Sequence, residues 1–406
     1  MEARTGQSAV DLKKTNRCLV LRTIVENPMI SRGALAKATR LSKMSVSNII
    51  TEFTEQGIVQ EINSDAAGCT GPGRKAGLLD LSDTTAPCII GVLISRDAVQ
   101  AALGDLRAHI LRTEKRRYPK AMSEEALFAM VIDVIDTVQA GYERRVIGVG
   151  VASMGPVNIH SGAILSPANY FGLHDIPIVD VIHRHTNLPV FFSSDSMAAA
   201  QAEKLLGEGR NHANFLFLLI FEGIGCGIIM HDRPYAGSRG LAGELGHSSI
   251  NLNGPICTCG SRGCLESYAS TECMLKCIRS NIPSGAAMPA SNWEEIWRAA
   301  TTGNEACVTA VHEYCDALSC ALVNLINVFD PELIYLYQHA DEQADKMMIE
   351  LLEKRIADKI LARDCRSITV RRASFGEQAA LIGTLSLVIA HIFSGELPLQ
   401  PGRYEA

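Results

Sequence analysis

Residues 246–266 read GHSSINLNGPICTCGSRGCLE, and this stretch sets the frame for the rest of the chain. It places a histidine ten residues before three closely spaced cysteines. Three thiolates and one imidazole complete the tetrahedral set that Zn²⁺ prefers and leave no open position, which is typical of a structural site. Gly260 and Gly263 allow a short loop to curl around the ion. The stretch therefore predicts one structural zinc ion per chain, with the ligands His247, Cys257, Cys259 and Cys264.

Two acids, Glu244 and Glu266, flank this cluster, and a metal ion would not need them as ligands. They either support the loop or serve another site. For the cysteines, the alternative is a loop of unligated buried thiols, which the spacing and the glycines disfavour. The whole chain has 13 cysteines, an odd number in a large protein. In a reducing compartment we expect thiols and metal ligands rather than a disulfide framework.

Length and composition indicate a cytoplasmic α/β protein of about two to three domains. The 406 residues are 47% hydrophobic and 20% charged. We find no apolar run of about 18 residues that would predict a membrane span, and residues 1–11 lack the apolar core of a signal peptide.

Charge is distributed unevenly along the chain. Residues 1–75 hold eleven Lys and Arg against seven Asp and Glu, so this segment carries +4 in a chain whose net charge is −6. The remainder therefore carries −10. A basic N-terminal segment (the head) on an acidic remainder (the body) suggests that the head binds an anionic polymer.

The sequence of the N-terminal head, residues 1–82, predicts three helices followed by a pair of strands. Helices are expected at 12–27, at Arg32–Thr39 after the N-cap Ser31, and from Ser42 to about residue 56. Strands are expected at 58–62 and 76–81. This order is that of a winged helix-turn-helix, with Arg40 at a turn position where glycine is common.

One face of the third helix is polar, and it predicts contacts to DNA bases and phosphates. The opposite face carries an apolar stripe at helical spacing. Basic residues in the expected wing would add phosphate or minor-groove contacts. The alternative is a three-helix bundle that binds protein. The DNA-contacting set predicted here is Arg32, Lys43, Met44, Ser45, Ser47, Asn48, Thr51, Arg74 and Lys75.

From residue 88 onwards strands and helices alternate, which predicts two lobes of mixed sheet with crossover helices. No internal repeat is obvious in the sequence. The expected strands are Cys88–Ile94, 98–103, 146–152, 215–221 and 225–230. The expected helices are 123–142, 196–206, 265–280 and 307–329.

The motifs in the body resemble the signature of the ROK family (repressors, open reading frames, kinases). The similarity extends from about residue 15 to about residue 390. It rests on E-L-G-H at 244–247, C-x-C-G-x-x-G-C-x-E at 257–266, and shorter matches at 155–156, 167–169, 330–332 and 376–383. The resemblance implies an actin/hexokinase-like (ribonuclease H-like) body of two lobes with a sugar in the cleft. It also implies that the chain is a member of the repressor branch, since only that branch carries the N-terminal head.

Three phosphate-binding elements of the family's kinases are changed in this chain. The Asp-x-Gly-Gly-Thr loop is replaced by residues 91–97, GVLISRD, with Arg96 in the turn. The second glycine loop keeps its glycines but has Glu222 where kinases have threonine. The late Gly-Gly pair is absent after Ile334. Phosphoryl transfer depends on positioning and charge neutralisation, so we predict that the chain is not an enzyme.

The sugar side of the family pattern is better kept. The resemblance implies sugar contacts from Asn169, Ser194, Asp195, Glu244, His247 and Glu266. Asp195 matches the position of the kinase base and could still accept a hydrogen bond from a sugar hydroxyl. The alternative role of Asp195 is a helix N-cap.

The combined interpretation is a sugar-responsive DNA-binding repressor of carbohydrate genes. We expect a winged helix-turn-helix domain at 1–82, a first lobe at 83–195 completed by a C-terminal helix near 376–394, and a second lobe at 196–375 with the zinc loop and oligomerisation helices. Expected partners are operator DNA, a small sugar or sugar-phosphate effector and a second copy of the chain, as a homodimer or homotetramer. Two alternatives stay open: a sugar kinase with an added head, and a repressor sequestered by a phosphotransferase-system permease.

Overall fold

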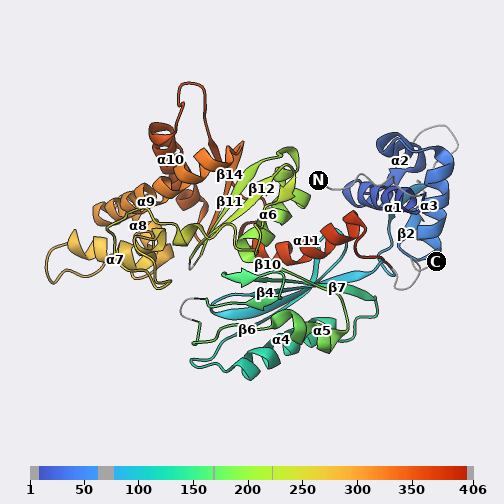
Figure 1. Ribbon diagram of the computed structural model, residues 1–406, viewed down its shortest axis with the longest axis horizontal. Helices are drawn as coiled ribbons and strands as arrows, with labels where there is room; N and C mark the ends of the chain where they lie inside the picture. The colour runs from blue at the N-terminus through green and yellow to red at the C-terminus, as the bar shows by residue number, and fades with distance from the viewer. Residues whose placement is uncertain (1–8, 63–76, 168–169, 222, 400–406) are drawn as a thin grey trace.

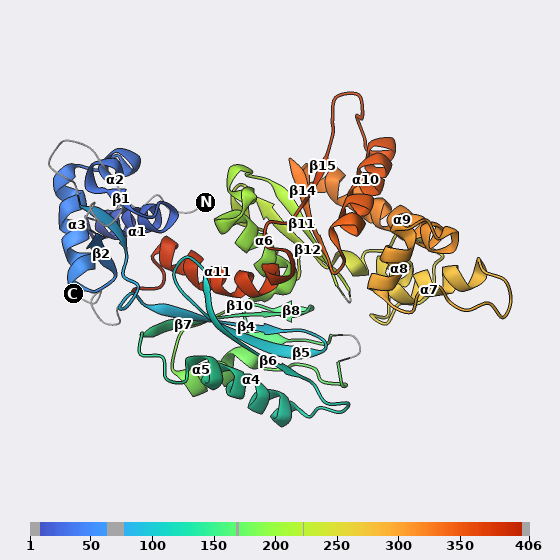
Figure 2. The same ribbon diagram turned by 180° about the vertical axis from the view of Figure 1, so that it is seen from behind.

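A small head and two larger lobes make up the chain (Figures 1 and 2). The computed structural model describes residues 9–62, 77–167, 170–221 and 223–399. Within this part of the chain the hydrophobic core is continuous from the head into the first lobe, because the head's buried side chains cluster with those of the C-terminal helix. The second lobe has a separate core.

The head consists of three helices and a small antiparallel sheet. Its helices are α1 (Ala9–Glu26), α2 (Arg32–Thr39) and α3 (Lys43–Glu55). Its sheet has the order β1-β3-β2, with β1 (Ile30–Ser31), β2 (Val59–Ile62) and β3 (Leu78–Leu81). The strand β1 has no counterpart among the predicted elements.

Local side-chain chemistry fixes the two short helices of the head. The Ser31 hydroxyl accepts a hydrogen bond from Ala34 N at 3.2 Å, and the Ser42 hydroxyl accepts one from Ser45 N at 3.0 Å. Both serines are therefore the N-caps that the sequence predicts. Arg40 ends α2 in the left-handed region with φ of 57°. The turn thus keeps the backbone conformation that favours glycine, with arginine in its place.

The first lobe contains a five-stranded sheet in the order β10-β7-β4-β5-β6. Helices α4 (Glu124–Gln139) and α5 (Ile178–Thr186) cover one face of it. A separate strand pair, β8 (Val157–Asn158) and β9 (Ala163–Ile164), lies nearby. The sheet strands are β4 (Cys88–Ile94), β5 (Ala98–Gly104), β6 (Ile110–Arg117), β7 (Val146–Ser153) and β10 (Val190–Ser194).

The second lobe contains a five-stranded sheet in the order β13-β12-β11-β14-β15. Its strands are β11 (Phe215–Ile220), β12 (Ile224–Met230), β13 (Arg233–Pro234), β14 (Leu333–Gln338) and β15 (Thr369–Arg372). The helices beyond the sheet are α7 (Thr271–Ser280), α8 (Trp293–Thr301), α9 (Glu305–Phe329) and α10 (Glu342–Lys359). Short 3₁₀ turns lie at Glu208–Asn211, Leu245–His247, Leu265–Ser267 and Gly376–Gln378.

One predicted helix is broken in the structure. The sequence predicts a single helix over 265–280, whereas the chain forms a 3₁₀ turn at Leu265–Ser267 and then α7. The Ser270 hydroxyl accepts a hydrogen bond from Cys273 N at 3.3 Å, so it caps α7 and starts the helix there. The break leaves Glu266 on the short turn that follows the cysteine loop.

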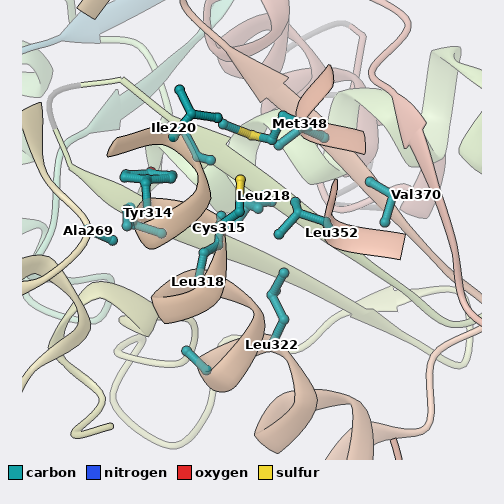
Figure 3. Packing of buried hydrophobic residues seen from close by; sticks show 14 of the residues in the cluster. Leu218, Ile220, Ala269, Tyr314, Cys315, Leu318, Leu322, Met348, Leu352 and Val370 are labelled. Atoms are coloured by element: carbon teal, nitrogen blue, oxygen red, sulfur yellow. The ribbon is translucent and has the colours of Figure 1, made fainter. Parts of the chain in front are cut away.

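The core of the second lobe lies where α9 meets α10 and the sheet (Figure 3). Cys315, Leu318 and Leu322 of α9 pack with Leu352 of α10 and with Leu218 of β11. All five side chains are buried. Both α9 and the segment Gly376–Ser394 are long and apolar enough to pass a test for membrane spans, and 61% of each tested window is buried in the fold. Their burial is that of core helices.

The two sheets share one topology. In each lobe three antiparallel strands come first, and two further strands then add in parallel to the first of them. The turn between β4 and β5 in the first lobe therefore corresponds to the turn between β11 and β12 in the second. This internal repeat is not visible in the sequence.

Two helices cross between the lobes. Helix α6 (Asp195–Leu206) follows the first sheet but packs on β11 and β12, while α11 (Ala379–Ser394) follows the second sheet but packs on β4 and β7. The two helices also pack against each other. A Cβ added to Gly383 would lie 2.6 Å from the carbonyl oxygen of Ala198, so glycine is required for this close approach.

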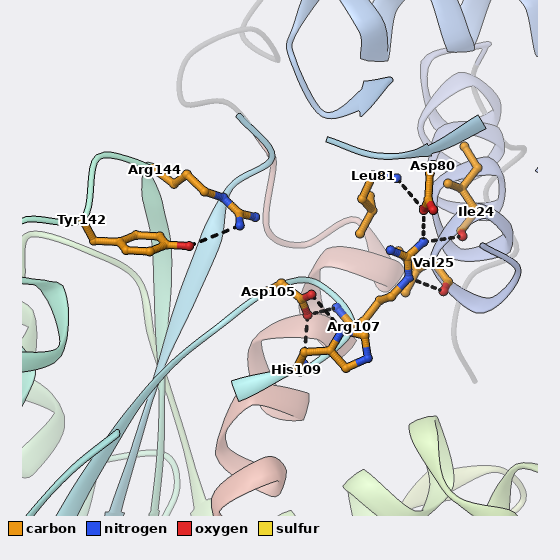
Figure 4. Close-up of polar contacts among 9 residues, drawn as sticks. All are labelled: Ile24, Val25, Asp80, Leu81, Asp105, Arg107, His109, Tyr142 and Arg144. Carbon is orange, nitrogen blue, oxygen red and sulfur yellow. Dashed lines mark hydrogen bonds and ion pairs between the residues drawn. The ribbon is translucent and has the colours of Figure 1, made fainter. Parts of the chain in front are cut away.

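A half-buried arginine of the first lobe adds polar contacts to the hydrophobic packing between the head and the body (Figure 4). Arg107, in the turn between β5 and β6, donates from Nε to Val25 O at 3.0 Å and from Nη2 to Ile24 O at 3.2 Å. It also forms an ion pair with Asp80 of β3. The C-terminal end of α1 and the head sheet are thereby joined to the first lobe, and Cys18 adds a contact to the end of α11.

Removing this attachment should loosen the head. Arg107→Ala deletes charge-assisted hydrogen bonds worth about 2 kcal/mol or more together. We expect amide hydrogens in residues 18–26 and 78–81 to exchange about thirtyfold faster than in the wild-type chain, while the sheets of the body keep their protection. Hydrogen–deuterium exchange read by mass spectrometry measures this directly. Arg363→Ala, at an exposed position after α10, is the matched control; equal exchange in both variants would show that Arg107 does not hold the head.

Candidate effector and metal site

One histidine and three cysteines form a group that could hold a metal ion. The ligand atoms of His247, Cys257, Cys259 and Cys264 all lie within 4.8 Å of one another. The sulfur atoms of Cys259 and Cys264 are 3.6 Å apart, and Cys257 Sγ is 3.8 Å from His247 Nδ1. The four residues that the sequence singles out are therefore brought together, with their donor atoms facing one another.

Backbone hydrogen bonds hold the cysteine loop in this shape. Cys257 N donates to Ser261 O at 2.8 Å, and Gly260 N donates to Cys257 O at 2.9 Å. Gly263 has φ of 67°, and a side chain there would collide with the backbone of Asn251. Glycine is therefore required at this position by conformation and by space.

The thiols of the cluster differ in acidity. Burial raises the pKa of Cys257, but hydrogen bonds from the Cys259 backbone and from His247 outweigh it and lower the pKa to about 6. Burial and the neighbouring thiols raise the pKa of Cys264 to about 12. One sulfur thus carries negative charge readily, while the adjacent one keeps its proton unless a cation replaces it.

Two of the predicted sugar-binding acids lie next to the metal cluster. Glu244 directly precedes the 3₁₀ turn that carries His247. Glu266 Oε1 accepts a hydrogen bond from Ile224 N at 3.1 Å, at the start of β12. Gly155 and Gly246 have no side chain, and this leaves space for the carboxylates of Glu244 and Glu266 respectively. The loop that could hold the metal therefore also sets the positions of both acids.

The third acid, Asp195, begins α6 at the junction of the lobes. Its Oδ1 accepts a hydrogen bond from Ser196 N at 2.6 Å. The N-cap of α6 is the preceding residue, Ser194, whose hydroxyl accepts from Met197 N at 3.4 Å. The capping role considered for Asp195 thus belongs to Ser194, whose hydroxyl is engaged with its own helix. Asn169 lies outside the described residues.

Burial makes Asp195 and Glu244 unusually weak acids. It raises the pKa of Asp195 to about 6, although the Ser196 backbone and the Arg96 guanidinium oppose the change. Burial and the nearby Asp195 carboxylate raise the pKa of Glu244 to about 7 against the opposing effect of His247. The two groups stand close enough to influence each other, which places them in one site. Partly buried acids that share a site are candidates for function.

A cavity of about 830 Å³ opens beside these acids, between the cysteine loop and helices α7, α8 and α9. Arg96 and Glu266 line it, whereas Asp195 and Glu244 are not among its lining residues. Trp293 and Tyr314 are also in its wall. Sequence reasoning missed these two aromatic residues. They come from α8 and α9, far along the chain from the motifs, and no local signal connects them to the site.

The predicted DNA-contacting face of α3 is largely open to solvent. Lys43, Met44, Asn48 and Thr51 are exposed, and 72% of Met44 is accessible. Ser45 is half-buried and shares a hydrogen bond with the hydroxyl of Ser42.

Two further residues predicted to contact DNA already interact with other side chains of the head. Arg32 donates to the Ser47 hydroxyl at 3.4 Å and forms an ion pair of 3.3 Å with Glu61. Arg32 and Ser47 are therefore already engaged inside the head. Arg74 and Lys75 lie outside the described residues.

Comparison with known proteins agrees with these features. A family model described as the ROK family matches residues 89–391. A xylose repressor from Caldicellulosiruptor bescii is 27% identical over 94% of this chain and 97% of the repressor. A glucokinase from Thermotoga maritima is 26% identical over 74% of this chain and 96% of the kinase. A crystal structure of a ROK family transcriptional regulator, a homologue of the E. coli MLC protein, matches with a TM-score of 0.80 at 26% identity, covering 95% of this chain and 98% of that chain.

Proposed function

The chain belongs to the ROK family, and from that premise we propose that it is a sugar-responsive transcriptional repressor rather than a sugar kinase. The observation that carries the proposal is the extent of the match. The transcriptional regulator is similar over 95% of this chain, whereas the glucokinase is similar over only 74%. The shared body suits sugar recognition, and the additional length fits a DNA-binding head.

In this proposal the head is a winged helix-turn-helix. Helix α3 is the recognition helix, since its exposed polar face is backed by the buried stripe Val46, Ile49, Ile50 and Phe53. The β2–β3 pair has the position of the wing. The domains are then 1–82 for DNA binding, 83–195 with 376–394 for the first lobe, and 196–375 for the second lobe.

The metal is proposed to be structural zinc. With Zn–S bonds of 2.3 Å, the edge of a tetrahedral site is about 3.8 Å long. The 3.6 Å and 3.8 Å separations between the facing donors suit such a site. Three thiols and an imidazole are also the donors that zinc favours. The ion would fix the loop that joins Glu244 to Glu266, so it would support sugar binding without touching the sugar.

The sugar is proposed to lie against Asp195, Glu244 and Glu266, with Asn169, Ser194 and His247 as further family positions. Carboxylates accept hydrogen bonds from the hydroxyl groups around a sugar ring. The site lies where α6 begins, and α6 packs against α11, whose far end contacts the head. Closure of the lobes around an effector could therefore change the presentation of two heads in a dimer or tetramer.

The kinase alternative is disfavoured by charge. Arg96 occupies the turn where family kinases hold Mg²⁺ with an aspartate. The neighbouring Asp97 does not replace that acid, because it accepts a hydrogen bond from Ser95 Oγ at 2.8 Å and faces Lys115 at 4.0 Å. A coupled ATP-turnover assay with glucose, xylose and N-acetylglucosamine tests this. We expect background rates; turnover that disappears in Asp195→Asn would show that the chain is a kinase.

A cytoplasmic repressor of this type could also respond to a protein. If a phosphotransferase-system permease is the effector, membranes that contain it should capture the chain, and pure sugars should not stabilise it. Sugar-dependent stabilisation of the pure protein without membrane capture favours the free-sugar mechanism. The two outcomes separate the alternatives.

DNA recognition by α3 has a direct test. Asn48→Ala removes an exposed amide suited to reading a base edge. We expect specific affinity for the chain's own upstream DNA to fall about tenfold to a hundredfold, with non-specific affinity unchanged, because a bidentate base contact is worth about 1–3 kcal/mol. Gel-shift titrations against specific and scrambled fragments measure both affinities.

The matched control is Asn253→Ala, which removes an exposed asparagine in the cysteine loop, away from the head. Equal losses on specific and scrambled DNA would assign Asn48 to general affinity. If the wild-type chain shows no sequence-dependent shift at any salt concentration, the repressor proposal fails.

A further inference from the structure

Two hairpin turns with the same place in the repeated topology face each other across the lobe junction. The β4–β5 turn carries Arg96, and the β11–β12 turn carries Gly223. A Cβ built on Gly223 would lie 3.7 Å from Arg96 Nη2 and 2.8 Å from Glu266 Oε1. The guanidinium of the first lobe therefore reaches the second lobe, at the edge of the acids proposed to bind the sugar.

Within the described residues, Arg96 forms no ion pair or hydrogen bond with a protein group. It is half-buried and lines the cavity together with Glu266. Against the larger effect of burial, the Arg96 charge lowers the pKa of the nearby Asp195, but the two side chains are not within ion-pair distance of each other. A half-buried guanidinium without a carboxylate partner is well suited to receive an anion from outside the chain, because it can donate two parallel hydrogen bonds to a carboxylate or phosphate.

The other basic side chains that line the cavity already have carboxylate partners. Lys276 Nζ is 2.7 Å from Glu272, and His339 Nε2 is 3.1 Å from Glu294. Among the lining residues that the structure describes, Arg96 is thus the cation without a carboxylate partner. An anionic group that enters this cavity has a single point of attachment, and that point adjoins the hydroxyl-binding acids.

Two aromatic residues in the cavity wall carry buried polar atoms without a hydrogen-bond partner. The Tyr314 hydroxyl and the Trp293 indole nitrogen are buried and lack a protein partner, and both residues line the cavity. Unsatisfied buried donors are rare in folded proteins. The volume of about 830 Å³ is large for one hexose ring, so there is space for a substituent beyond the ring.

We propose that the effector is an anionic monosaccharide, a phosphate ester or a carboxylate, whose anion binds Arg96. Its ring hydroxyls bind Asp195, Glu244 and Glu266. The anion lies beside the turn that carries Arg96, where this chain lacks the residues that hold ATP phosphates in family kinases, and the guanidinium donates two parallel hydrogen bonds to it. This inference rests on the proposed sugar-responsive function and narrows it to a chemical class.

The test compares matched sugars on the full-length chain. Glucose is paired with glucose 6-phosphate and glucuronate, and N-acetylglucosamine with its 6-phosphate; inorganic phosphate alone is a further probe. Titration calorimetry should show that an anionic sugar binds at least about tenfold more tightly than its neutral parent. Binding of glucose 6-phosphate but not glucuronate would identify the anion as a phosphate ester, and the reverse would identify it as a carboxylate.

Variants locate the contact. Arg96→Gln should weaken the anionic sugar at least about tenfold and leave the neutral parent within about twofold, and Arg96→Lys should restore part of the loss because it keeps the charge. Arg117→Gln, an exposed arginine at the end of β6, is the control and should change neither. The inference is overturned if neutral sugars bind as tightly as their anionic partners, or if Arg96→Gln weakens both equally, which would make Arg96 a counter-charge for Asp195.

The outcomes also distinguish this inference from the proposed function. If neutral sugars bind and alter DNA affinity, the repressor proposal stands and only the anionic class is wrong. If no sugar of either kind binds while specific DNA binding persists, both the anionic class and the sugar effector are wrong, which leaves the protein-effector alternative.

Discussion

Asp195→Asn is expected to abolish the effect of the effector on DNA binding and, at pH 8, to stabilise the ligand-free chain. The asparagine keeps an oxygen that can accept the hydrogen bond from Ser196 N. It loses the charge that strengthens a hydrogen bond from a sugar hydroxyl. Effector affinity should fall about a hundredfold, since a charge-assisted hydrogen bond in a partly buried site is worth about 1.5–3 kcal/mol.

The stability effect follows from the raised pKa of Asp195, which is about 6 in the folded chain against an ordinary value of 3.8. The folded state binds this proton more tightly than the unfolded state, so folding is favoured at low pH. The advantage is lost as pH rises from about 4 to about 6. At pH 8 the ionised carboxylate costs on the order of 3 kcal/mol, which Asn removes.

Thermal denaturation at pH 5 and pH 8 checks this prediction. The variant should melt about 4–8 °C higher than the wild type at pH 8, with a smaller gain at pH 5. Asp83→Asn, at an exposed position between β3 and β4, is the control. A variant that melts lower than the wild type at pH 8, or that still responds to effector, would mean that Asp195 is structural.

Cys259→Ser is expected to remove the zinc ion and the effector response together. The remaining three donors leave the tetrahedral set incomplete, and structural zinc in small domains contributes folding free energy outright. Here the loop would lose the ion that fixes Glu244 relative to Glu266. We expect zinc content to fall from about one per chain to near zero and the free energy of unfolding to fall by on the order of 3 kcal/mol.

Elemental analysis of the purified chain measures the zinc content, and denaturation with and without a chelator measures the stability. Cys320→Ser is the matched control, because that cysteine is exposed on α9 and outside the cluster. The zinc assignment is wrong if Cys259→Ser keeps a full equivalent of metal. The coupling of metal to sensing is wrong if the variant loses zinc and still responds to effector normally.

The features that could be predicted from sequence are those encoded over short stretches. Ser31 and Ser42 cap their helices by accepting hydrogen bonds from backbone amides three residues later. The start of each helix is therefore determined by neighbouring residues in the sequence. The metal cluster is equally local, because its four ligands fall within 18 residues that contain two turn-forming glycines. Local signals failed where Ser270 restarts a helix that hydrophobic periodicity alone makes continuous.

The features that could not be predicted depend on contacts between distant segments. Arg107 meets Ile24 and Val25 across more than 80 residues, and nothing near it in the sequence indicates a partner in the head. The cavity wall combines Arg96 of the first lobe with Tyr314 of α9. The repeated lobe topology is likewise a property of strand pairing, which the divergent side chains of the two halves do not reveal.

We propose that this chain couples a sugar site to a DNA-binding head and has lost phosphoryl transfer. Fluorescence anisotropy of a labelled fragment of the chain's own upstream DNA, titrated with sugar at fixed salt, tests that coupling most directly. We expect sequence-specific binding whose affinity changes at least about tenfold when the effector is added, with no change in Asp195→Asn, since allosteric couplings are typically about 1–3 kcal/mol. Specific DNA binding that every sugar leaves unaltered in the wild-type chain would contradict it.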